Sequence, residues 1–215
     1  LTKGNPLLAR AHHKPLFFTD RDFQSFAGAP DPADVTAVAH ESAAVLVGAG
    51  RTNSDPEVTR RLIALTDEIG LSTLAQLWAG RPAVSLPGVL WRLYTLREWV
   101  RRDAVGAAGD YNAGIRHAHV SHAVAGSADP SGPAEIKALA DRILEGAYTG
   151  DFAVALERAA AFCRVVASGR AERAERHDGH DDALAAREAL SAARLGDTAR
   201  DLTKAASAWR IGNLD

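Results

Sequence analysis

Apolar residues recur at helical spacing along residues 86–102, LPGVLWRLYTLREWVRR. One stripe follows the i, i+4, i+7 and i+11 spacing of a single helix face: Val89, Leu93, Leu96 and Val100. Other apolar side chains extend this stripe around most of the helix: Leu90, Trp91, Tyr94 and Trp99. Pro87 suits the first turn, because its missing N–H would have no helical partner there. A helix that is apolar on most sides needs neighbours on several of them, so the pattern predicts a buried central helix.

Five further stretches carry a helical pattern of apolar positions. They are residues 31–50, 54–70, 72–79, 133–150 and 151–166. Two of them start with an Asp-Pro pair, and several end at a glycine, which is the order of start and stop residues typical of helices. No stretch alternates Val, Ile and Thr between hairpin turns, as strands do. We therefore expect an all-α fold, an irregular multi-helix bundle around the central helix with a C-terminal helical arm.

The pattern is specific for residues 31–50 and weak for residues 103–133. In residues 31–50 we expect the buried face to consist of Val35, Val38, Ala39, Ser42, Val45 and Leu46. Residues 103–133 are rich in Gly, Ala, Asp and Ser and show only a weak helical pattern, around residues 111–124. The sequence therefore assigns no structure to residues 103–133.

Changes in composition divide the chain into four parts. We expect an N-terminal surface arm at residues 1–15, a helical bundle domain at 16–168, a charged linker at 169–182 and a C-terminal helical arm at 183–215. The bundle would begin with a short helix carrying Phe23 and Phe26. The linker is a charge-dense run without an apolar face, which is typical of a solvated segment or a frayed helix.

The C-terminal arm has a narrow apolar seam. Its members alternate at spacings of three and four, as in a coiled coil: Ala192, Leu195, Ala199, Leu202, Ala206 and Trp209. Gly196 and Asp197 interrupt the seam, so we expect two helical pieces. The seam predicts either a protein partner or self-association through the arm, with Leu195, Leu202 and Trp209 as the contact residues. The alternative is that the seam packs on the chain's own bundle.

Composition narrows the classes of partner. The formal net charge is −2, which disfavours extensive binding to nucleic acid without excluding it. No apolar run approaches the roughly 20 residues of a membrane-spanning helix, so we expect no membrane contact. The single cysteine, Cys163, lies in an apolar run. A thiol in such surroundings is inert, and the cysteine content is compatible with a cytoplasmic location.

Candidate catalytic and metal-binding motifs are weak throughout. The chain contains no G-x-S-x-G elbow, no P-loop and no G-x-G-x-x-G. His117, His119 and His122 form an H-x-H-x-x-H cluster, but no Cys, Asp or Glu falls within it, and only the last two histidines share a helix face. We therefore expect no catalytic residue, no metal site and no cofactor.

The arginines of the central helix are the strongest candidates for chemistry. Arg92 and Arg97 emerge among apolar residues, and an unpaired buried charge costs several kcal/mol. Their guanidinium groups must therefore reach water or find carboxylates. Structural pairing is the first interpretation. The functional one is an anion-binding site formed by Arg92 and Arg97 with Arg101 at its rim, because guanidinium groups bind oxyanions through two parallel hydrogen bonds.

Residues 13–23, HKPLFFTDRDF, and residues 86–102 together resemble parts of an uncharacterised helical family found in actinobacteria. The resemblance covers about residues 13–168 and implies no established activity. The sequence thus leaves three functional hypotheses. The first is a non-enzymatic interaction or regulatory module, and the second is a small-anion or nucleotide-binding protein that uses the central arginines. The third is a transcription-associated DNA-binding protein with a basic face made of Arg60, Arg61, Arg92, Arg101 and Arg102.

Overall fold

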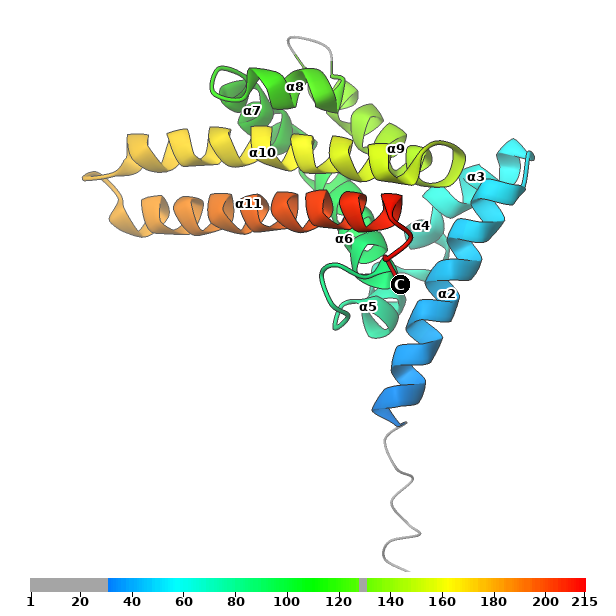
Figure 1. Ribbon diagram of the computed structural model, residues 1–215. Coiled ribbons are helices and arrows are strands. Elements are labelled where there is room, and N and C mark those ends of the chain that lie inside the picture. Colours follow the sequence, from blue (N-terminus) through cyan, green and yellow to red (C-terminus); the bar gives the residue numbers. More distant parts are fainter. Residues whose placement is uncertain (1–30, 128–130) are drawn as a thin grey trace, which may run out of the picture. The chain divides into compact units, whose positions relative to one another are not determined.

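The computed structural model describes residues 31–127 and 131–215 (Figure 1). The chain separates into two units, Leu1–Pro32 and Ala33–Asp215, and the account below concerns the second. The predicted arm at residues 1–15 and the short helix with Phe23 and Phe26 lie outside the described residues. In the described part the structure contains ten helices and no strand, which confirms the all-α prediction.

The helices follow one another with short connections. They are α2 (Pro32–Thr52), α3 (Pro56–Ile63), α4 (Leu65–Ile69), α5 (Leu71–Trp78), α6 (Leu86–Arg102), α7 (Ala104–Ile115), α8 (His119–Ala125), α9 (Pro133–Thr149), α10 (Phe152–His177) and α11 (Asp182–Arg210). Asp55 and Asp151 cap α3 and α10, since each carboxylate accepts hydrogen bonds from backbone N–H groups of the first turn.

The helix predicted at residues 86–102 is α6, with the same bounds. The Ser85 hydroxyl caps it by accepting a hydrogen bond from the N–H of Gly88 at 3.2 Å. Leu93 and Tyr94 are buried in the core, and the Tyr94 hydroxyl donates to the carbonyl of Leu62 at 2.6 Å. α6 is therefore covered by other elements on several sides, as its apolar circumference requires.

The longest helices, α10 and α11, run antiparallel and side by side (Figure 1). Residues 169–177, which the sequence marks as the start of a charged linker, continue α10, so that only residues 178–181 connect the two helices. The expectation that Gly196 and Asp197 divide the arm is wrong, because α11 is unbroken. A glycine within a helix costs roughly 1 kcal/mol. Packing of α11 on α10 offsets this cost, so the helix continues through Gly196 and Asp197.

Residues 103–127, to which the sequence assigns no structure, contain α7 and α8. The Tyr111 ring of α7 stacks on Phe162 of α10 with 5.3 Å between ring centroids. The backbones of α7 and α10 meet at two glycines, because a Cβ on Gly114 would lie 1.8 Å from the carbonyl oxygen of Val165, and one on Gly169 would lie 1.9 Å from that of Asp110. Small residues in this region thus allow two helices to cross in backbone contact.

The predicted buried face of α2 is wrong in part. Val38 is 50% exposed and Val45 is 61% exposed, whereas the helix buries a neighbouring stripe: Ala39, Ala43, Val47 and Gly50. A Cβ on Gly50 would lie 2.7 Å from the Tyr148 ring of α9. Close packing against Tyr148 thus needs a glycine at position 50, and the buried face of α2 is the one that contains Gly50.

Candidate binding surfaces

Two of the three predicted anion-binding arginines are paired on one side of α6. The Arg97 side chain is only 4% exposed, and its Nε lies 2.6 Å from Oδ1 of Asp141. Another nitrogen of the same guanidinium lies 3.9 Å from Asp67, whose carboxylate is 3.0 Å from Arg101. The guanidinium groups of Arg97 and Arg101 thus form ion pairs with Asp67 and Asp141, which favours the structural interpretation of both arginines.

Arg92 points elsewhere. It is five residues from Arg97, which corresponds to about 140° around a helix. Arg92 therefore faces α11, whereas Arg97 faces α4 and α9. One guanidinium nitrogen donates to the carbonyl of Gly88 at 3.1 Å, and another lies 3.4 Å from Asp201. The structure therefore separates Arg92 from the other two arginines.

The arginines proposed for a DNA-binding face all have carboxylate partners. The pairs are Arg60 with Glu57, Arg61 with Glu68, Arg92 with Asp201, Arg101 with Asp67, and Arg102 with Glu98. These carboxylates reduce the excess of positive charge around the five arginines, so the structure adds no support to the DNA-binding hypothesis.

The seam of the C-terminal arm faces the chain's own bundle. Leu202 is fully buried, and Leu195 packs at the edge of the same core. The Trp209 ring lies 4.6 Å from that of Phe152, centroid to centroid, and the Arg51 guanidinium lies 5.7 Å from the Trp209 ring. This geometry corresponds to the alternative in which the seam packs within the chain, with Leu202 buried and with Leu195 and Trp209 half-buried.

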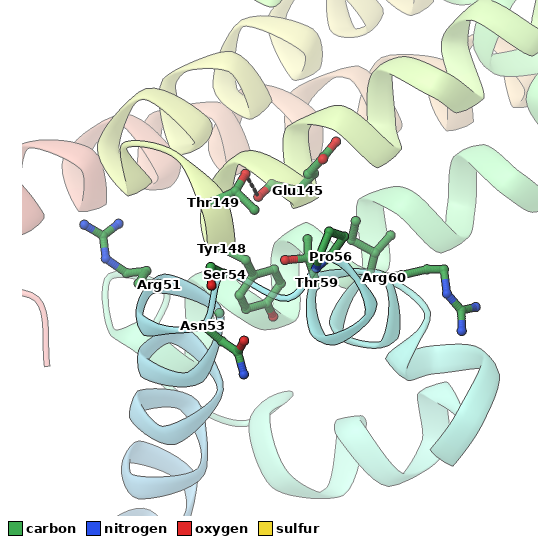
Figure 2. Close-up of a pocket in the computed structure, with 11 residues that line it drawn as sticks. Arg51, Asn53, Ser54, Pro56, Thr59, Arg60, Glu145, Tyr148 and Thr149 are labelled. Atoms are coloured by element: carbon green, nitrogen blue, oxygen red, sulfur yellow. Dashed lines mark hydrogen bonds between the residues drawn. The ribbon is translucent and has the colours of Figure 1, made fainter.

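A cavity of about 560 Å³ lies between α2, α3 and α9 (Figure 2). Figure 2 shows Arg51 and Arg60 extending away from the central Tyr148 in opposite directions. Arg51 donates to the carbonyl of Gly150 at 3.0 Å, and Arg60 pairs with Glu57. The Tyr148 hydroxyl is 2.6 Å from that of Tyr94, and burial raises the pKa of Tyr148 well above its ordinary value. The cavity thus lacks a converging acid–base pair.

The histidine cluster and the cysteine also show no catalytic arrangement. Nε2 of His117 lies 3.3 Å from Glu172, while Nδ1 of His122 is 3.1 Å from the Tyr111 hydroxyl. No group of three His, Cys, Asp or Glu side chains in the described residues is placed to hold a metal ion. Burial raises the pKa of the Cys163 thiol to about 12, which leaves it protonated and unreactive at neutral pH.

An open groove of small side chains follows one flank of the α10–α11 pair. Two hollows, of about 510 and 630 Å³, meet at Ala167 and Ser168. We call the surface that joins them the alanine groove and define it by Ala167, Ser168, Ala171, Ala189, Ala193 and Gly196. Val120 of α8, which is 80% exposed, lines the same surface. Small side chains permit close approach of another helix.

The alanine groove lies on a different face of α11 from Leu202 and Trp209, and the seam residue Ala192 lies at its edge. Ala189, Ala193 and Gly196 follow one another at spacings of four and three, so they form one stripe. That stripe is rotated by roughly a quarter turn or more from the stripe of Leu202. Sequence reasoning missed it because alanine is only weakly apolar. The available signal was the recurrence of Ala and Gly at helical spacing.

Comparisons with known proteins add no relative to this picture. No family model, no curated protein and no solved structure matches the chain. Among the described helices, none combines the length and the apolar character needed to cross a membrane. The functional assignment therefore depends on the geometry of the binding surfaces.

Proposed function

We propose that this protein is a non-enzymatic interaction module that pairs with a second copy of itself through the alanine groove. The observation that carries the proposal is the continuous open surface of Ala171, Ala189 and Ala193, which are all exposed on the outer flank of two long helices. An exposed apolar surface of this extent on paired helices is typical of an interaction site. The proposal thus retains self-association through the C-terminal arm, but it assigns the contact to a different face of α11 from the predicted seam.

The charges along the groove favour a second copy as the occupant. The hollow nearer the α10–α11 connection is lined by Glu175, whereas the hollow farther from it is lined by Arg164, His117 and His119. Glu175 and Arg164 are eleven residues apart, which is about 16 Å along a helix. In a twofold pair of antiparallel hairpins, Glu175 of each copy meets the basic end of the other, as a self-complementary interface requires.

Sedimentation equilibrium of the full chain tests the proposal. We expect the mass of two chains at micromolar concentration. Ala193→Glu should shift the protein to the mass of one chain, because it places a charge in the centre of the groove. Ala183→Glu is the matched control, since Ala183 is exposed on the same helix and belongs to neither hollow.

Circular dichroism spectra and thermal unfolding should be the same for both variants and the parent, because both positions are exposed. A parent chain that sediments as a monomer, or an Ala193→Glu variant that still pairs as the control does, contradicts the proposal.

A further inference from the structure

The alanine groove contains one basic and one acidic side chain that lack a partner among the described residues. His119 lines the hollow farther from the α10–α11 connection, and Glu175 lines the nearer one. Both side chains are exposed, and neither forms a hydrogen bond or an ion pair with a described residue. An imidazole titrates near about pH 6.5 and a glutamate carboxyl near about pH 4.3. The charge of the groove therefore changes at the pH where His119 gains a proton.

The other two basic side chains of the same hollow already have partners. The Arg164 guanidinium donates to the Thr203 hydroxyl at 2.6 Å, and Nε2 of His117 lies 3.3 Å from Glu172. Both contacts are made within one chain, so they exist before and after two copies meet. His119 is therefore the basic group of this hollow that is available to a carboxylate of a second copy.

Twofold pairing of two copies brings these exposed groups together. The hollows meet at Ala167 and Ser168. A twofold axis at this point places the Glu175 hollow of each copy over the His119 hollow of the other, because a twofold interface uses the same surface on both copies. Each pair then contains two contacts between an imidazole and a carboxylate. Small apolar side chains surround both groups, and exclusion of water from such a contact strengthens the attraction between opposite charges.

We propose that His119 makes the self-association pH-dependent, so that two copies bind more tightly when its imidazole is protonated and faces Glu175 of the second copy. This inference rests on the proposed pairing through the alanine groove and adds its regulation. The sign follows from the charges. A protonated imidazole meets an ionised carboxylate below about pH 6.5, whereas a neutral imidazole at higher pH leaves the carboxylate without a counter-charge.

The other charged groups near this contact lie on α8, α10 and α11 and in the connection before α8. Two of them titrate in the same range, but each is bonded within the chain, His117 to Glu172 and His122 to the Tyr111 hydroxyl. Their protonation is therefore common to the single chain and the pair. The groups that keep a fixed charge at neutral pH are Arg116, Arg164, Glu172, Arg176, Asp197 and Arg200. His119 is thus the titrating group that gains a charged partner when two copies meet.

Sedimentation equilibrium of the full chain at constant ionic strength tests the inference, with one sample at about pH 5.5 and one at about pH 8, on either side of the imidazole pKa. We expect the dissociation constant of the pair to be about tenfold lower at the acid pH, as two exposed ion pairs together would give. His119→Gln keeps a polar side chain that cannot gain a charge, and it should reduce this change to less than about twofold. Glu175→Gln should do the same. His180→Gln is the matched control and should keep the tenfold change, because His180 is an exposed histidine that lines neither hollow.

The outcomes separate this inference from the pairing itself. A parent chain that is monomeric at both pH values contradicts the pairing and the inference with it. A parent that pairs equally tightly at both pH values leaves the pairing intact and overturns the role of His119. A His119→Gln variant that keeps the full pH dependence, or a His180→Gln variant that loses it, overturns that role as well. Circular dichroism spectra of the variants should match that of the parent, because all three positions are exposed.

Discussion

The seam and the alanine groove of α11 show how one helix divides its surface between folding and exposure. Leu202 and Trp209 are stacked against the core, while Ala189 and Ala193 remain exposed. Burying a leucine contributes about 1.5 to 3 kcal/mol and burying a methyl group much less. The strongly apolar seam therefore packs within the chain, and the weakly apolar alanine groove is the face that a second molecule can contact.

The largest effect should come from shortening a seam leucine. Leu202→Ala should lower the free energy of unfolding by about 2 to 5 kcal/mol, because the residue is fully buried and leaves a cavity. Leu190→Ala on the same helix is the matched control, since Leu190 is 53% exposed, and it should cost less than about 0.5 kcal/mol. Urea unfolding measures both. Equal costs would remove the distinction between the two faces.

A second contrast concerns the crossing of α7 and α10. Gly114→Ala should destabilise the protein by about 1 to 3 kcal/mol, because the new Cβ meets the backbone carbonyl of Val165 at 1.8 Å. Gly109→Ala on the same helix meets no atom within 4 Å and should stabilise by about 0.5 to 1 kcal/mol through improved helix propensity. Thermal unfolding of the two variants checks the sign. A gain at both positions would mean that the helices do not touch there.

The smallest effect should be at the exposed end of the pair. Two guanidinium nitrogens of Arg210 lie 2.6 and 2.8 Å from the two oxygens of Glu157, and this hydrogen bonding lowers the pKa of Glu157. A carboxyl whose folded-state pKa is lowered adds stability above its unfolded pKa and loses it as the pH falls through the folded value. Arg210→Gln should therefore raise the pKa of Glu157 in an NMR titration and reduce stability slightly at neutral pH.

The stability difference between Arg210→Gln and the parent should vanish in acid, at pH values below the folded pKa of Glu157. An unchanged Glu157 titration would show that the ion pair is not formed in solution.

The sequence predicts α6 well because its apolar residues are large and regularly spaced. It also predicts the starts of α2 and α3, where Asp-Pro pairs lie at the first turn. It fails for α7, since the Gly and Ala residues that permit contact at Gly114 carry almost no periodic signal. The end of α10 is missed for a different reason. Charges in that run suggest solvent, but Arg170 and Arg173 pair with the buried Asp110.

Among the candidate binding residues, the sequence predicts the pairing of Arg97 but not that of Arg92. The requirement that Arg97 be paired follows from its place in an apolar helix, and the structure supplies Asp141 for it. The carboxylate partner of Arg92 does not follow from the sequence, because Asp201 lies 109 residues away on α11. A long-range contact of this kind depends on which face of each helix packs, and the exposed Val38 and Val45 of α2 show that apolar spacing alone does not identify that face.

The central claim is that α11 belongs to the core and is not a detachable arm. Removing residues 176–215 tests it most directly, with cooperative urea unfolding followed by circular dichroism and with sedimentation in parallel. The account predicts that the remainder loses its cooperative transition, because deletion exposes the buried faces of α10 and α6 to water. A remainder that keeps the cooperative transition of the parent and sediments as a smaller oligomer would contradict the claim and identify the arm as an assembly element.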